Sequence, residues 1–159
     1  MKAKLISLTL MTAVLIGCAD RPQGTPTERA TALVKAKNLS QYPVDNLDSV
    51  YGYEDVHSCN MAALNLQWAA DSIIINQRAQ KRLLNPKERD EVSSLAKTIF
   101  ALRTEAARTE MKYRLENRKR ELVGLMCVFA DSLDGNMTTV YFDTDITKIT
   151  GVERNITDL

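Results

Sequence analysis

Apolar positions recur at helical spacing in two long stretches of the chain. In the first stretch, intervals of three and four residues join Val56, Cys59, Ala63, Leu66, Ala70 and Ile73. In the second, the same intervals join Val92, Leu95, Ile99, Leu102, Ala106, Thr109 and Tyr113. Such intervals place the side chains in one narrow stripe along an α-helix. The pattern therefore predicts two long helices that pack against each other through these stripes, which we call the inner stripes.

Helix-start signals occur twice, at residues 25–28 (TPTE) and 85–88 (NPKE). Each has a capping residue, a proline at the first helical position and a glutamate that can close a capping box. The first signal predicts a short helix from Pro26 to about Lys37. The second predicts a break at Leu84 or Asn85 and a new helix from Pro86. A connection this short favours antiparallel packing of the two long helices.

The second long helix is expected to end near Glu121. Basic side chains gather before that point, where they would complement the helix dipole, and we prefer this interpretation to a binding patch. They are Arg114, Arg118, Lys119 and Arg120. Residues 38–53, with scattered proline, asparagine, aspartate and glycine, are predicted to form an ordered loop.

The pattern changes after Glu121 to continuous apolar and β-branched runs. Residues 122–131 and 137–143 are predicted strands, joined by turn residues, and a third short strand over 147–152 is an open alternative. A lone hairpin is marginally stable in water, so these strands must pack on the helices. The predicted fold class is α+β: a short N-terminal helix, an antiparallel pair of long helices and a C-terminal β-hairpin.

The first residues have the layout of a secretory signal peptide. A basic start precedes an uncharged apolar run from Leu5 to Gly17, which is shorter than the roughly 20 residues that span a bilayer as a helix. Residues 19–25 contain proline and glycine but no large apolar side chain. They predict a tether that reaches at most about 25 Å.

Residues 15–18, Leu-Ile-Gly-Cys, resemble the lipobox of bacterial lipoproteins. The resemblance implies a diacylglycerol on the Cys18 thiol, cleavage before Cys18 and acylation of the new amino group. More than one acyl chain is needed for stable anchoring in a bilayer. The resulting division is a signal peptide over 1–17, a lipidated cysteine and tether over 18–25, and one domain over 26–159. The alternatives are an ordinary signal peptide followed by a chance cysteine, or a buried apolar strand.

The lipobox also implies a compartment. The expected location is the bacterial cell envelope, with the bilayer held through Cys18. In enteric bacteria, an aspartate after the lipidated cysteine retains a lipoprotein at the inner membrane; here Ala19 follows, which favours the outer membrane and its periplasmic face. Loss of Lys2 and Lys4 with the signal peptide would leave 19 basic against 20 acidic residues. A near-neutral chain has no long-range attraction for nucleic acid, which we exclude as a partner.

Two cysteines remain beside Cys18. An even pair in an oxidising compartment is a disulfide candidate, and both Cys59 and Cys127 fall on faces predicted to be buried. The alternative is a pair of buried free thiols, since free cysteine packs as a small hydrophobe.

Candidate chemistry is sparse. His57 is the only histidine, and no G-x-S-x-G motif is present, so no nucleophile, base and orienting group can be assembled from a known pattern. Acidic and amide residues near the hairpin ends lack the order of a calcium loop, and turn capping explains them better. These residues are Asp131, Asp134, Asn136, Asp143 and Asp145. We therefore predict no catalytic residue, no metal and no cofactor.

A second resemblance covers most of the mature chain. "DSVYGY" (48–53) before a long helix, together with "TTVYFDTDITKITGVE" (138–153), is similar to small Bacteroidetes lipoproteins of unknown function. That group implies an architecture and no catalytic residue. Bacteroidetes O-glycosylate Asp-Ser/Thr-apolar triplets, and Ser49, in the predicted loop, is the best acceptor among three such triplets.

These features predict a non-enzymatic, membrane-anchored module that binds an unidentified envelope protein or assists envelope assembly. The alternatives are an accessory subunit of a periplasmic enzyme and an inhibitor or immunity lipoprotein. Trp68 lies off the inner stripe. It is a candidate partner contact unless the hairpin or the N-terminal helix covers it. An exposed apolar patch would favour a binding partner.

Overall fold

The computed structural model describes residues 23–130 and 137–155, and the α+β class is confirmed. Over these residues the elements follow the order α1 (Pro26–Ala36), β1 (Asp48–Gly52), α2 (Glu54–Ala79), α3 (Pro86–Leu115), β2 (Glu121–Ala130), β3 (Met137–Phe142) and β4 (Ile149–Asn155). The lipobox, Cys18 and the turn residues Asp131, Asp134 and Asn136 lie outside the described ranges.

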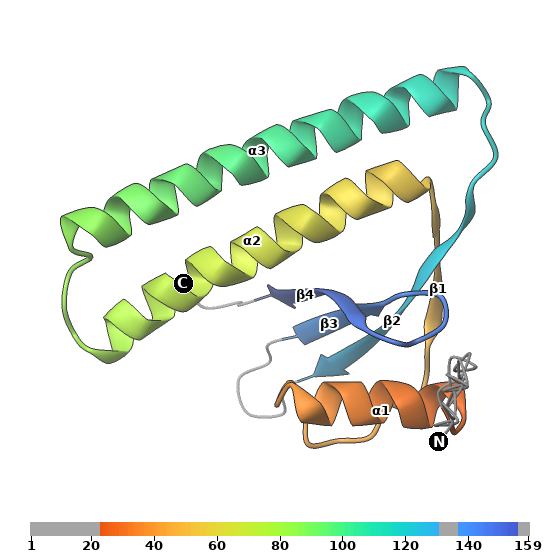
Figure 1. The fold of residues 1–159 in the computed structure, drawn as a ribbon, viewed down its shortest axis with the longest axis horizontal. Helices are drawn as coiled ribbons and strands as arrows, with labels where there is room; N and C mark the ends of the chain where they lie inside the picture. Colours follow the sequence, from red (N-terminus) through yellow and green to blue (C-terminus); the bar gives the residue numbers. More distant parts are fainter. Residues whose placement is uncertain (1–22, 131–136, 156–159) are drawn as a thin grey trace, which may run out of the picture.

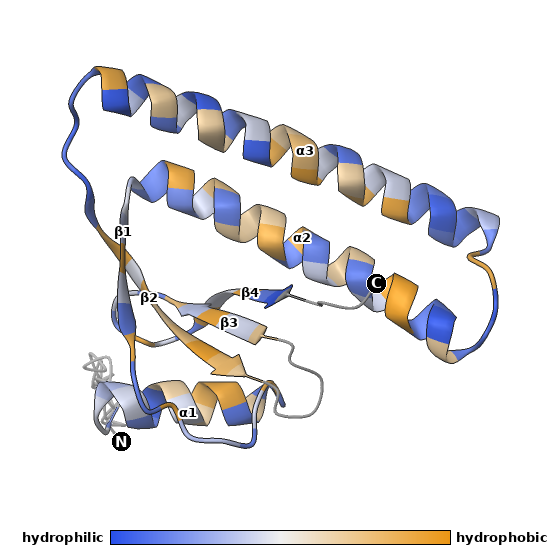
Figure 2. Ribbon diagram, turned by 180° about the vertical axis from the view of Figure 1, so that it is seen from behind, coloured by the Kyte–Doolittle hydropathy of each residue, from blue (hydrophilic) through white to orange (hydrophobic). Residues whose placement is uncertain are grey.

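The elements form layers around one antiparallel sheet of order β1-β2-β3-β4. Helix α1 covers one face of the sheet and α2 the other, while α3 lies on the far side of α2 (Figure 1). Apolar residues follow β2 and β3 through the middle of these layers (Figure 2). The third C-terminal strand, left open by the sequence, is formed by β4.

Both helix-start signals act as predicted. The Thr25 hydroxyl accepts from the Glu28 amide at 3.3 Å, and the Glu28 carboxylate accepts from the Thr25 amide at 2.7 Å. The capping box of α3 is tighter, with both bonds between Asn85 and Glu88 at 2.9 Å. Arg82 adds an ion pair to the Glu88 carboxylate at 2.6 Å. Bonding to Arg82, and to the Asn85 amide, lowers the pKa of Glu88 to about 2.

The inner stripes meet where the sequence places them. Val56, Ala63 and Ala70 on α2 and Ile99 and Ala106 on α3 are buried, and the other members of the inner stripes are half-buried. The small side chains of Ala63, Ala70 and Ala106 allow the helix axes to approach closely. The predicted antiparallel helical hairpin is therefore confirmed.

The prediction of a loop over 38–53 is wrong at its end, because residues 48–52 form β1. Its sequence, DSVYG, combines strand-favouring Val50 and Tyr51 with aspartate and glycine, which are depleted in strands, and three of its five residues are exposed. Backbone pairing with β2 makes it a strand, with Asp48 opposite Met126 and Gly52 opposite Glu121. A bulge between Val50 and Tyr51 shifts the register. Pairing with a segment about 70 residues away along the chain is invisible to local pattern.

The predicted end of the second long helix is also wrong. Helix α3 ends at Leu115, and Asn117 takes a left-handed conformation with φ of 52°. The Arg118 amide then donates to the Tyr113 carbonyl at 2.9 Å, which satisfies a helix-end carbonyl. Asparagine tolerates this conformation better than most residues. Of the predicted basic cluster, only Arg114 lies in the last turn; Arg118, Lys119 and Arg120 follow the helix.

An aromatic cluster holds this helix end against the start of α2. The Tyr53 and Tyr113 rings meet edge to face with centroids 4.9 Å apart, and the Arg118 guanidinium stacks 4.3 Å from the Tyr113 centroid. The Tyr113 hydroxyl donates to Asp55 at 2.5 Å, and the Tyr53 hydroxyl donates to the Arg118 carbonyl at 3.0 Å. These contacts close the helical hairpin at the end nearest β1 and β2.

The main core lies between α1 and the sheet. It consists of Ala30, Val34, Val44, Cys127, Val140, Phe142 and Ile146. Ile146 enters it from a turn in which its φ is 53°, a conformation that costs a branched residue about 1–2 kcal/mol. Its side chain is only 2% exposed, and burying a side chain of this size contributes about 1.5–3 kcal/mol. Burial therefore offsets the strained backbone.

Candidate functional site

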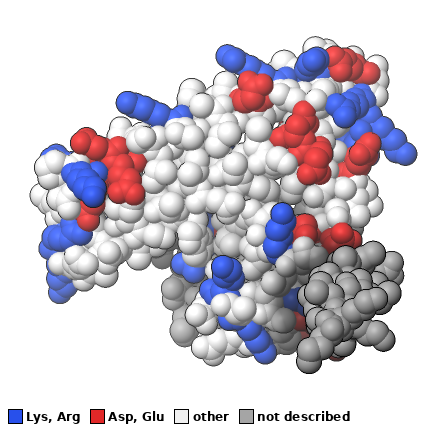
Figure 3. Space-filling model, viewed as in Figure 1, with Lys and Arg blue, Asp and Glu red and all other residues white. Residues whose placement is uncertain are grey.

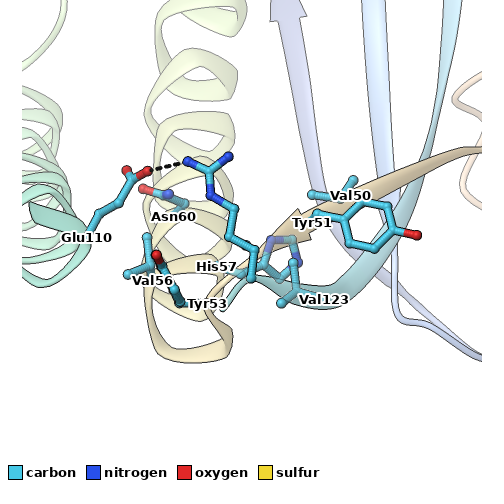
Figure 4. A pocket seen from close by; sticks show the side chains of 10 residues that line it. Val50, Tyr51, Tyr53, Val56, His57, Asn60, Glu110 and Val123 are labelled. Carbon is cyan, nitrogen blue, oxygen red and sulfur yellow. Dashed lines mark hydrogen bonds and ion pairs between the residues drawn. The ribbon is translucent and has the colours of Figure 1, made fainter. Parts of the chain in front are cut away.

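A pocket with a cavity volume of about 260 Å³ lies between the start of α2, the β1–β2 pair and α3 (Figure 4). Glu110 of α3 reaches into it and accepts hydrogen bonds from Arg114 at 2.6 Å and from Arg120 at 3.3 Å. One carboxylate is shared by two guanidinium groups, so Glu110 is paired and this edge of the pocket keeps a net positive charge. Its lining residues include no serine, threonine or cysteine.

His57 belongs to the same pocket but turns its ring toward the sheet. Its Nε2 atom is buried without a hydrogen-bond partner among the described residues. A methyl carbon placed on Gly124 would lie 3.3 Å from that atom, so the ring packs on the β2 backbone. Burial lowers the pKa of His57, and the charge of Glu54 opposes this shift weakly. The imidazole therefore serves packing in this position.

The burial of His57 should make the stability of the protein depend on pH. The unfolded chain binds a proton on His57 near pH 6.5, whereas the folded chain does so only at lower pH. The stabilisation by neutral His57 is therefore present above pH 6.5 and is lost as the pH falls below it. We expect the free energy of unfolding to fall more between pH 7.5 and 5.5 in the wild type than in His57→Gln, as measured by chemical denaturation. Equal losses in the two proteins would contradict this account of His57.

The structure contradicts the predicted disulfide, because Cys59 and Cys127 are both free. Cys127 faces α1 in the main core, on one side of the sheet. Cys59 packs with Tyr53, Val56 and Ala106 on the opposite side. Burial raises the pKa of Cys127 to about 11, which keeps it a neutral thiol at physiological pH. The alternative of two free thiols is the one observed.

Two other predicted site residues occupy ordered positions. Ser49 lies in β1 opposite Leu125, with an exposed side chain, so it is in a strand and not in a loop. Trp68 is half-buried, and the Arg154 guanidinium of β4 stacks 4.3 Å from its ring centroid. Coverage of Trp68 thus comes from β4 and not from α1. Glycosylation at Ser49 and a partner contact at Trp68 stay predictions.

Asp143 behaves as the capping interpretation expects. Its carboxylate accepts from the Thr147 amide at 2.7 Å and from the Lys148 amide at 3.1 Å, and it also binds the Thr147 hydroxyl. These bonds close the turn between β3 and β4. Across residues 23–130 and 137–155, no group of three or more histidine, cysteine, aspartate or glutamate side chains is arranged to hold a metal ion.

A second apolar stripe runs along the solvent side of α3. We call it the outer stripe, and it consists of Ala96, Phe100, Ala107, Met111 and Leu115. Phe100 is 74% exposed, Met111 66% and Leu115 80%. At 100° per residue, this set lies roughly 140° around the helix from the inner stripe. The outer stripe could have been recognised in the sequence from its intervals of four and seven residues. It was missed there because the inner stripe has more members and a more regular spacing.

Comparison with known proteins gives no family assignment. No family model matches the chain, and no curated protein or solved structure is significantly similar to it. None of the helices in the described parts of the chain is long and apolar enough to cross a bilayer.

Proposed function

We propose that this protein is a non-enzymatic binding module of a bacterial envelope, anchored through acylated Cys18, that presents the outer stripe of α3 to a partner protein. The observation that carries the proposal is the exposure of Phe100, Met111 and Leu115 along one helix face. Single exposed apolar residues are normal on protein surfaces, whereas an aligned set indicates an interaction site. Phenylalanine and methionine are also frequent at protein interfaces.

The position of α3 in the layers supports this function. α3 packs on α2 and lies away from the sheet, so its inner stripe alone satisfies its packing (Figure 1). A helix with one neighbour needs one apolar stripe to fold. The outer stripe is therefore not required by the fold of this chain, which favours a role in binding.

The tether favours a partner over the anchoring bilayer. Residues 19–25 separate Cys18 from α1, and a chain of that length reaches at most about 25 Å. α1 lies on the opposite side of the sheet from α2 and α3 (Figure 1). Anchoring at Cys18 would hold the α1 layer near the membrane and direct α3 away from it.

The proposal predicts that Phe100→Asp abolishes partner binding without unfolding the protein. Exposed substitutions usually change stability by no more than about 0.5 kcal/mol, whereas loss of an interface hot spot costs 2 kcal/mol or more, about 30-fold in affinity. The measurement is recovery of a specific protein by affinity purification of the full lipidated chain from its native envelope, with thermal unfolding of each variant alongside.

Leu83→Asp is the matched control. Leu83 is 88% exposed but lies in the connection between α2 and α3, outside the outer stripe. We expect this variant to retain the partner. Cys18→Ala should release the protein from the membrane fraction. Retention of the same partner by Phe100→Asp, or membrane association that survives Cys18→Ala, would refute the corresponding half of the proposal.

A further inference from the structure

We infer that the partner docks on the outer stripe of α3 as an amphipathic helix whose apolar face is bordered by acidic side chains. This inference rests on the proposed function and names the chemistry of the partner. It depends on the charges that border the outer stripe, on their pairing within the chain and on the length of the stripe.

Basic side chains border the outer stripe on both sides. Helical geometry at 100° per residue places Lys97 and Arg108 on one side of Phe100, and Arg103 and Arg114 on the other. From Ala96 to Leu115 the helix carries five basic residues and two acidic ones. Figure 3 shows Lys and Arg side chains projecting at intervals along the edge of the molecule that α3 forms. An apolar strip between basic borders is complementary to an apolar strip between acidic ones.

Most of these cations have no carboxylate partner in the described parts of the chain. Ion pairs within 4.0 Å involve Arg114 and Lys112, but not Lys97, Arg103 or Arg108. The acidic residue nearest the outer stripe is Glu110, and Arg114 and Arg120 already occupy it. Lys97, Arg103 and Arg108 are therefore available to pair with acidic groups of a partner.

The same charges argue against two other occupants. A second copy of the chain docked through its own outer stripe would bring basic borders together, and like charges oppose such contact. An anionic bilayer would suit a basic amphipathic helix. However, anchoring at Cys18 through a tether of at most about 25 Å would hold α1 toward the membrane, on the far side of the sheet from α3.

Length sets the size of the docking segment. The outer stripe extends over 19 residue steps from Ala96 to Leu115, or about 28 Å at 1.5 Å per residue. A partner helix of about 20 residues would cover it. Recognition of this kind places apolar anchors at intervals of three and four residues. Aspartate or glutamate should flank those anchors.

Photo-crosslinking in the native envelope tests the inference on the full lipidated chain. Benzoylphenylalanine at position 100 should crosslink to a protein whose linked segment, identified by mass spectrometry, is helical in pattern and acidic at its borders. The control position is Tyr42, which is 65% exposed and lies after α1, on the other side of the sheet. Position 42 should not capture that partner.

Charge-reversal variants provide a second test of the inference. Arg103→Glu combined with Arg108→Glu should reduce the crosslink from position 100 at least tenfold. Lys35→Glu combined with Lys37→Glu, on exposed positions of α1 and the residue after it, should leave the crosslink unchanged. Thermal unfolding of both double variants checks that the fold persists.

Four results would overturn the inference: no crosslink from position 100, a crosslink to lipid, a crosslink to a second copy, or one to a segment without acidic borders. Persistence of the crosslink after reversal of Arg103 and Arg108 would do the same. If Phe100→Asp loses a partner that the charge-reversed chain keeps, the proposed function stands and the inference fails. If neither variant changes partner recovery, both fail.

Discussion

Replacing Phe142 by alanine is expected to lower the free energy of unfolding by about 3–5 kcal/mol. Phe142 is fully buried at 0% exposure, in the core between α1 and the sheet. Removing its ring leaves a cavity lined by Val34, Val140 and Ile146, which belong to three different elements or turns and cannot all move inward. Because a domain is stable by only about 5–15 kcal/mol, this loss is a large fraction of the total.

Phe100→Ala is the matched control for Phe142→Ala. The same atoms are removed, but the Phe100 ring is 74% exposed, so the free energy of unfolding should change by less than about 0.5 kcal/mol. Chemical denaturation of the purified variants, analysed for midpoint and slope, measures the change in the free energy of unfolding for Phe142→Ala and for Phe100→Ala. Similar losses at the two positions would mean that the Phe142 side chain does not occupy the core described here.

Gly124→Ala is expected to cost about 2–3 kcal/mol through overpacking. A methyl carbon at Gly124 would lie 2.7 Å from the Phe142 carbonyl oxygen and 3.3 Å from His57 Nε2. The carbonyl belongs to the backbone of β3, which pairs with β2 and cannot withdraw without breaking the sheet. The clash must therefore be relieved by displacing a strand.

The same substitution at two other glycines should cost less stability than at Gly124. At Gly151 the added carbon would meet the Met61 sulfur at 2.8 Å, but a methionine side chain can turn away, so Gly151→Ala should cost less. At Gly52 the nearest atom is a Val123 methyl carbon at 3.6 Å, an ordinary contact, and Gly52→Ala should be nearly neutral. The denaturation midpoint should be highest for Gly52→Ala, intermediate for Gly151→Ala and lowest for Gly124→Ala. A different order would contradict the close approach of β2 and β3 at Gly124.

Local sequence accounts for the helices of this protein. Residues 25–28 and 85–88 contain every group of their capping boxes within four residues, so the helix starts are independent of the rest of the chain. The inner stripes likewise need only the period of the α-helix to be recognised. The α+β class and the helical hairpin follow from these two patterns.

The tertiary structure decided the features that join distant segments. β1 became a strand because β2 offers it a partner, and the side of the sheet that each cysteine faces depends on how α1 and α2 cover it. α3 ends at Leu115, where Asn117 turns the chain toward β2.

The candidate binding surface shows the same division. Its apolar period is present in the sequence, but a buried and an exposed stripe have the same period. Only the packing of α3 on α2 decides which stripe faces solvent, because exposure depends on which neighbours a helix has.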